Sequence, residues 1–162
     1  MMILRRFLVL QSLMLWQGGF LFYATFVVPI GTEILGSAQE QGKITRLVTE
    51  QLNLVGGVAL VFLLWDLLAT RQVRFQFRLR LGLWFLMLMS LLAMIWLHFQ
   101  LESIIDAAIE SPLDRRIFRP LHRLYLWLTT LQWAAAVIFS ISMIRIWTRP
   151  RGSEATCSSS SL

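Results

Sequence analysis

Charge, histidine and cysteine are all scarce in this sequence. Of the 162 residues, 15% are charged, two are histidine and one, Cys157, is cysteine. So few charged side chains cannot cover the surface of a water-soluble globule of this size. A single cysteine excludes an internal disulfide and leaves the redox compartment undecided. A soluble fold is therefore a poor explanation of the chain, and we expect a membrane protein.

What the chain has in excess is apolar sequence, gathered into long runs. Hydrophobic residues make up 57% of it, and its mean hydropathy is +0.65. A helix rises about 1.5 Å per residue, so about 20 apolar residues cross a hydrocarbon layer of about 30 Å. Runs of that length favour helices over the short alternating strands of a β-barrel. The expected spans are residues 7–30, 50–69, 81–101 and 121–146.

We expect one domain, because the four spans share one interface and no internal repeat is visible. It covers residues 1–149, and the serine-rich residues 150–162 are expected to form a flexible polar tail. The first span follows two arginines as a signal peptide would. Its apolar core is too long, however, and lacks a small-residue cleavage site, so an uncleaved helix is expected.

Positive charge is unevenly shared between the two sides of these spans. Nine arginines lie in the two end segments and the second connection, against six lysines and arginines in the first and third connections. Cytoplasmic segments carry the excess of positive charge. With acidic residues included, the inner side carries +7 and the outer side −1. The expected fold is an all-α, integral membrane four-helix bundle of up-down-up-down topology, with both termini cytoplasmic, in a bacterial inner membrane.

The net charge of +6 does not indicate nucleic-acid binding. The arginines lie where membrane topology and anionic lipid headgroups place them. The expected partner is the lipid bilayer, together with a further membrane protein or a second copy of the chain.

Two amides lie at similar depth in the first and last spans. Gln17 and Gln132 are eleven and thirteen residues from the nearest inner arginines, which places both near the midplane. Small residues beside each amide let helices approach closely in lipid, so contact between these two spans is expected. The glutamines then either join the helices by hydrogen bonds or, with Trp16 and Trp133, line a small ligand cavity.

The third connection contains a marked helix start, and the last span that follows it has one polar face. Ser111 followed by Pro112 predicts a helix beginning there. Its polar residues recur at steps of three and four, and a lipid-facing stripe would leave them without hydrogen-bond partners. The face is therefore expected to point inward, with Tyr125, Thr129 and Gln132 as candidates for ligand contact. The full stripe is His122, Tyr125, Thr129, Gln132, Ala136 and Ser140.

Histidines near the outer boundary raise the question of a metal. His98, Glu102 and Asp106 lie at four-residue steps, which is compatible with a divalent metal site, although surface ion pairs explain the same pattern. His98 and His122 could also ligate haem or copper, but their spacing matches no recognised ligand signature. The sequence predicts no cofactor, with haem or copper as the alternative.

Asp66 is the acidic residue expected inside a span, about one turn from its inner edge. An ionisable side chain in a membrane helix usually has a partner and is a functional candidate. We expect an ion pair with Arg71 or Arg145. The alternative role is a proton relay.

A family resemblance rests on two segments. Residues 15–20 (LWQGGF) with residues 27–29 (VVP) resemble the transmembrane-protein-205-like family, and residues 118–125 look like that family's Phe-x-x-x-His segment. The resemblance implies a small four-helix membrane protein and no particular reaction. A more distant similarity to copper-resistance D-type membrane domains depends on the Trp-x-Gly-Gly element, without a methionine-histidine ligand run.

The chain shows no nucleophile-base pair, phosphate loop or zinc spacing. We therefore expect a non-enzymatic integral membrane protein that binds a small hydrophobic ligand or partner helices through a polar bundle interior. The alternatives are a haem- or copper-handling redox membrane protein and a small oligomeric transporter.

Overall fold

The structure is a computed structural model that describes the backbone of residues 2–36, 38–70, 74–107 and 112–148. The side chains at 38–39, 101–107 and 112–119 lie outside the description. Within the described ranges all regular structure is helical, and four helices are long and apolar enough to cross a membrane. The expected all-helical class is confirmed. The tail predicted at 150–162 lies outside the described residues.

The first of the four helices contains two widened turns. It runs through α1 (Met2–Leu13), α2 (Gly19–Phe22) and α3 (Val28–Leu35), joined by π-helical turns at Met14–Gly18 and Tyr23–Val27. Each widened turn changes which side chains face inward in the residues that follow. Trp16 and Tyr23, the buried aromatic side chains of this helix, both lie in these turns.

The other three helices are α4 (Ala38–Ala69), α5 (Arg74–Ala107) and α6 (Pro112–Trp147). They are longer than the predicted spans because a helix can continue into the headgroup region, where charged ends are solvated. The predicted start at Pro112 is confirmed. α3 ends at Gly36, whose φ of 61° is the left-handed conformation that glycine adopts without strain.

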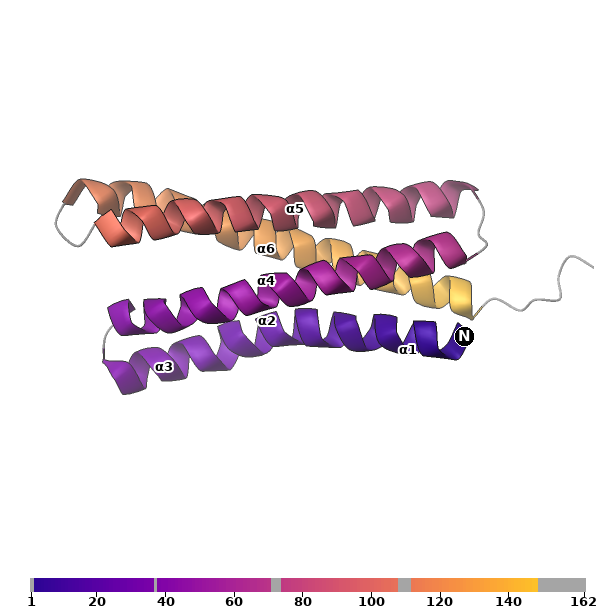
Figure 1. Ribbon diagram of the computed structural model, residues 1–162, viewed down its shortest axis with the longest axis horizontal. Helices are drawn as coiled ribbons and strands as arrows, with labels where there is room; N and C mark the ends of the chain where they lie inside the picture. The colour runs from indigo at the N-terminus through magenta and orange to yellow at the C-terminus, as the bar shows by residue number, and fades with distance from the viewer. Residues whose placement is uncertain (1, 37, 71–73, 108–111, 149–162) are drawn as a thin grey trace, which may run out of the picture.

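The helices lie lengthwise beside one another (Figure 1). α1 packs along α4, α4 along α5, and α5 along α6, as expected for helices joined by short connections. Glycines allow the first helix to approach α4: a Cβ at Gly56 would lie 2.5 Å from the indole Nε1 of Trp16, and one at Gly19 would lie 2.8 Å from Leu52. Small residues thus bring the first two helices close together. The contact predicted between the first and last spans is also present, since Trp16 and Phe139 belong to one buried cluster.

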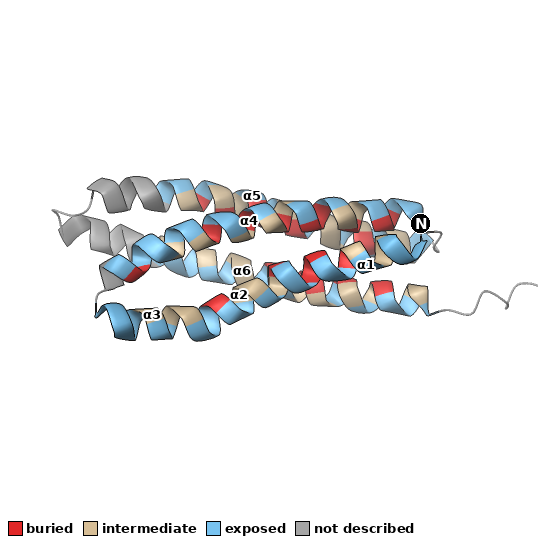
Figure 2. Cartoon of the chain, turned by 60° about the horizontal axis from the view of Figure 1, so that its bottom comes forward, coloured by how far each residue is buried: buried red, intermediate tan, exposed pale blue. Residues whose placement is uncertain are grey.

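The core is concentrated in the half of the bundle that contains the N-terminus, as Figure 2 shows by its buried residues. Side chains from all four helices meet there. The cluster comprises Val9, Leu13, Trp16, Ala59, Leu60, Leu63, Met87, Leu91, Ala135, Ala136, Phe139 and Met143. In the other half, a hydroxyl pair connects the first helix to α4, where Tyr23 donates to the Thr45 oxygen at 2.9 Å.

Candidate functional site

A buried carboxylate near the end of α4 is bound by two guanidinium groups. Asp66 and Arg80 are both fully buried, and Arg80 Nη2 lies 2.9 Å from Asp66 Oδ2. Arg5 Nε lies 3.0 Å from the second carboxylate oxygen, and the Arg5 side chain is 12% exposed. Charges this far from solvent are tolerated only when they are paired and hydrogen-bonded. The ion pairs tie α4 to both α1 and α5.

Thr70, one turn beyond Asp66, completes this arrangement. Its hydroxyl donates to Asp66 Oδ1 at 3.3 Å and accepts from Arg5 Nη2 at 3.1 Å. Arg80 also lies over the Phe139 ring of α6, with its guanidinium carbon 4.6 Å from the ring centroid. We call Arg5, Asp66, Thr70 and Arg80 the Asp66 cluster. Helices α1, α4 and α5 meet at this cluster, and α6 contacts it through Phe139.

The ion pair predicted for Asp66 is confirmed, but with different partners. Arg145 is exposed near the end of α6, and Arg71 lies outside the described residues. The α4–α5 hairpin instead places Arg80 opposite Asp66. Arg80 is the last residue of the predicted second connection, next to the span expected from residue 81, so charge counting assigned it to the membrane surface rather than to the interior.

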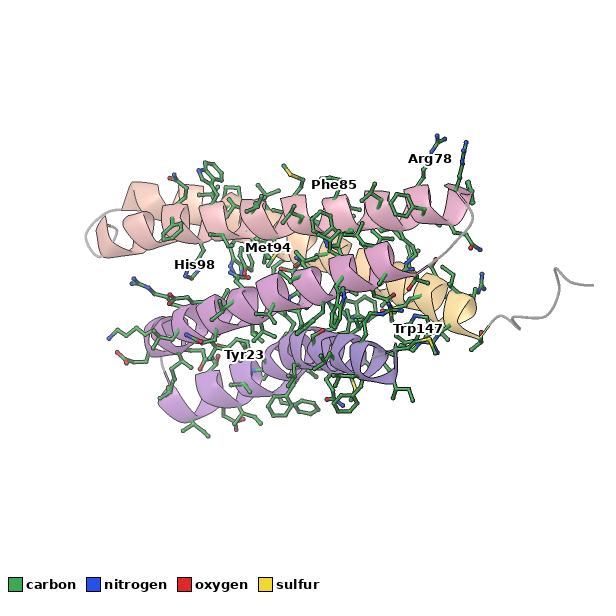
Figure 3. All side chains as sticks on the ribbon, turned by 45° about the vertical axis from the view of Figure 1, so that its right-hand side comes forward. Tyr23, Arg78, Phe85, Met94, His98 and Trp147 are labelled. Carbon is green, nitrogen blue, oxygen red and sulfur yellow. The ribbon has the colours of Figure 1, made fainter. Side chains whose placement is uncertain are left out.

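A second group of polar side chains lies between α4, α5 and α6, farther from the N-terminus. Asn53 is 7% exposed, and its side chain lies near the buried hydroxyl of Tyr125 across the bundle. The Thr129 hydroxyl donates to the Tyr125 carbonyl at 2.9 Å and contacts the Met94 sulfur at 3.7 Å. We call Asn53, Tyr125 and Thr129 the interior polar layer. Figure 3 shows Met94 and His98 pointing from α5 toward α4, whereas Arg78 and Phe85 point away.

Two atoms of this layer are buried without a hydrogen-bond partner of good geometry. They are Oδ1 of Asn53 and the hydroxyl oxygen of Tyr125. A buried polar atom without a partner costs about 1 to 3 kcal/mol, and lipid supplies no water to replace the missing bond. Tyr125 and Thr129 were predicted to face inward, and the structure places them there. Asn53 was not among the predicted site residues.

The four residues predicted around the midplane do not form one site. Trp16 is fully buried against Gly56, whereas Trp133 is 39% exposed. Gln132 is buried and donates to the main-chain oxygen of Met87 in α5 at 3.3 Å. Gln17 is half-buried in the widened turn, and no hydrogen bond joins it to Gln132 in the described part of the chain. Gln132 therefore joins two helices by a hydrogen bond, as predicted, but its partner is α5 and not the first helix.

The two histidines differ in how exposed they are. His98 is half-buried on α5, and His122 is exposed near the start of α6. Among the side chains that the structure describes, no three histidine, cysteine or acidic residues come together as metal ligands. Glu102 and Asp106, the other two members of the predicted metal set, lie outside the described side chains. Haem or copper binding therefore stays a prediction.

Two further contacts were missed by sequence reasoning. The indole nitrogen of Trp84 in α5 donates to the main-chain oxygen of Leu60 in α4 at 2.8 Å. At the same end of the bundle as the Asp66 cluster, the guanidinium of Arg6 lies 4.9 Å from the ring centroid of Trp147. Tryptophan is enriched at membrane boundaries, so the sequence could indicate the depth of Trp84 and Trp147 in the membrane. It could not indicate which residues they contact.

No family model, curated protein or solved structure matches this chain. The resemblance of residues 15–20 and 118–125 to the transmembrane-protein-205-like family stays a prediction. Because a fold alone does not imply a function, the function must be argued from the two polar groups described above.

Proposed function

We propose that the chain is a non-enzymatic integral membrane protein that binds a small hydrophobic ligand through its interior polar layer. Its four helices cross a cytoplasmic membrane in up-down-up-down order, with both ends in the cytosol. The charge difference between the two sides, +7 against −1, supports this orientation.

The distribution of side chains supports the membrane location. Large apolar residues face outward on every helix, for example Ile3 at 81%, Phe75 at 75% and Trp127 at 72% exposed. The charged pair of Asp66 and Arg80, by contrast, is fully buried. Exposed apolar surface around a buried ion pair is unfavourable in water and suits a lipid environment.

The observation that carries the ligand proposal is a pair of buried atoms, Oδ1 of Asn53 and the hydroxyl oxygen of Tyr125, that make no hydrogen bond of good geometry. One is an amide oxygen, which accepts a hydrogen bond, and the other belongs to a hydroxyl, which can donate one. They lie on α4 and α6 with the Met94 sulfur of α5 nearby. An apolar molecule bearing one hydroxyl or carbonyl group would satisfy these atoms and bury its remainder among the helices.

Native mass spectrometry of the protein released from mild detergent tests this proposal. We expect an adduct of a few hundred daltons on the wild-type chain, and its loss in Asn53→Leu and Tyr125→Phe. The control is Thr130→Val, because Thr130 is exposed on the same helix. An adduct that persists in both interior variants, or a wild-type chain that carries none, contradicts ligand binding at this layer.

The same variants separate a ligand from a partner helix. If a second membrane chain supplies the missing bonds, Tyr125→Phe lowers the oligomeric mass measured in mild detergent and leaves no small adduct to lose. If neither ligand nor partner is bound, Tyr125→Phe removes an unsatisfied hydroxyl, so stability is unchanged or higher. That last result contradicts the proposal.

A further inference from the structure

At the end of the bundle where the chain begins, Arg6 and Trp147 present two hydrogen-bond donors side by side. The Arg6 guanidinium lies over the Trp147 ring at 4.9 Å from its centroid. Arg6 Nε and Trp147 Nε1 are both buried and have no acceptor. Both residues are half-buried as a whole, so the pair still reaches the surface between α1 and α6. One cationic donor and one neutral donor are thus held together without an acceptor.

The charge at this end is also unbalanced. Both oxygens of Asp66 are engaged by Arg5 and Arg80. Among the described residues, Arg6 has a ring contact and no ion pair. Two guanidinium groups therefore share one carboxylate, and Arg6 adds a further positive charge on the same helix as Arg5. A cation at a membrane boundary attracts an anion, and the attraction is strongest where water is partly excluded.

We propose that Arg6 and Trp147 form a binding site for a phosphate group. A guanidinium donates two parallel hydrogen bonds to phosphate oxygens. The indole N–H of Trp147, which has no acceptor, is a third donor beside it. The phosphate belongs either to the headgroup of an anionic phospholipid in the cytosolic leaflet or to a soluble phosphate compound. The lipid source depends on the orientation given under the proposed function, whereas the donor pair itself does not.

Lipid binding is measured by native mass spectrometry in detergent with added phosphatidylglycerol or, separately, phosphatidylcholine. The wild-type chain is expected to retain phosphatidylglycerol about tenfold more strongly, because loss of a charge-assisted hydrogen bond has roughly that effect. Arg6→Gln and Trp147→Phe are expected to abolish the preference. Trp147→Phe keeps an aromatic ring under Arg6 and removes only the N–H, so it tests the site even if Arg6→Gln fails to fold.

Arg78→Gln is the matched control, because Arg78 is an exposed arginine at the same end of the bundle and points away from it (Figure 3). It should retain the wild-type preference. A preference lost equally in all three variants, or retained in Arg6→Gln and Trp147→Phe, overturns the site.

Inorganic phosphate, titrated against thermal unfolding in a neutral detergent, distinguishes the two sources. Stabilisation by phosphate that depends on Arg6, without a phosphatidylglycerol preference, assigns the site to a soluble phosphate. A phosphatidylglycerol preference that phosphate does not compete away assigns it to lipid. The interior variants Asn53→Leu and Tyr125→Phe should leave both readouts unchanged, so failure of the ligand proposal is distinguishable from failure of this one.

Discussion

Replacing Asp66 with asparagine should destabilise the protein strongly, because it leaves a guanidinium buried without its counter-ion. Arg80 is fully buried and 2.9 Å from the carboxylate, and removing one partner of a buried ion pair typically costs about 3 to 5 kcal/mol. Arg5 is 12% exposed and can turn toward the headgroups, so most of the cost comes from Arg80. We expect a loss of about 3 kcal/mol, the lower end of that range.

Reversible unfolding in mixed micelles, followed by circular dichroism as sodium dodecyl sulfate is added, measures this loss. The control is Glu40→Gln, which removes the acid of an exposed pair. Lys43 lies 2.9 Å from Glu40, with side chains 71% and 55% exposed, and such surface pairs contribute about 0 to 1 kcal/mol. The contrast between the two variants isolates the effect of burial.

A double variant tests the physical cause. Asp66→Leu combined with Arg80→Met removes both buried charges, and apolar replacement of a whole buried pair is often neutral. We expect the double variant to regain most of the stability lost in Asp66→Asn. A loss below about 1 kcal/mol for Asp66→Asn, or a double variant less stable than the single one, would refute the buried ion pair.

Two further predictions concern the packing of tryptophans. Gly56→Ala should cost about 1 to 3 kcal/mol because its Cβ would meet the buried Trp16 ring at 2.5 Å, whereas Gly57→Ala, which meets nothing within 4 Å, should be neutral or stabilising. Trp84→Phe should cost about 1 kcal/mol through loss of the hydrogen bond to α4, and Trp96→Phe, at 59% exposure, less than about 0.5 kcal/mol. The same micelle titration measures the stability of all four variants. Equal losses for Gly56→Ala and Gly57→Ala would contradict the contact of Trp16 with Gly56, and equal losses for Trp84→Phe and Trp96→Phe would contradict the hydrogen bond from Trp84.

The helices could be predicted because a membrane span is a property of consecutive residues. Run length and composition alone indicated four spans, and four long apolar helices are present. Pro112 marked the start of α6 because proline fits the first turn of a helix. The predicted ends were too short, since the charged flanks that end the apolar run do not end the helix.

The partners of the polar residues could not be predicted in the same way. Asp66 was identified from its position alone, but its pairing with Arg80 depends on how the α4–α5 hairpin aligns two helices. Counting residues from the inner arginines placed Gln17 and Gln132 at the same depth in the membrane, which suggested that they are in contact. Such a count contains no information on the direction in which a side chain points.

The widened turns explain part of that error. Trp16 and Gln17 lie in a π-helical turn, and such a turn changes which neighbouring residue faces inward. No residue pattern in the sequence indicated it. Trp16 packs against Gly56 of α4 while Gln17 is only half-buried. The predicted group of two tryptophans and two glutamines is therefore not assembled.

The central claim, four crossings with both ends in the cytosol, is tested most directly by reporter fusions. Green fluorescent protein and alkaline phosphatase would be fused in parallel to each end and after residues 36, 72 and 110. We predict fluorescence at both ends and after residue 72, and phosphatase activity after residues 36 and 110. Phosphatase activity at either end, or the same side reported for two successive connections, would contradict the account.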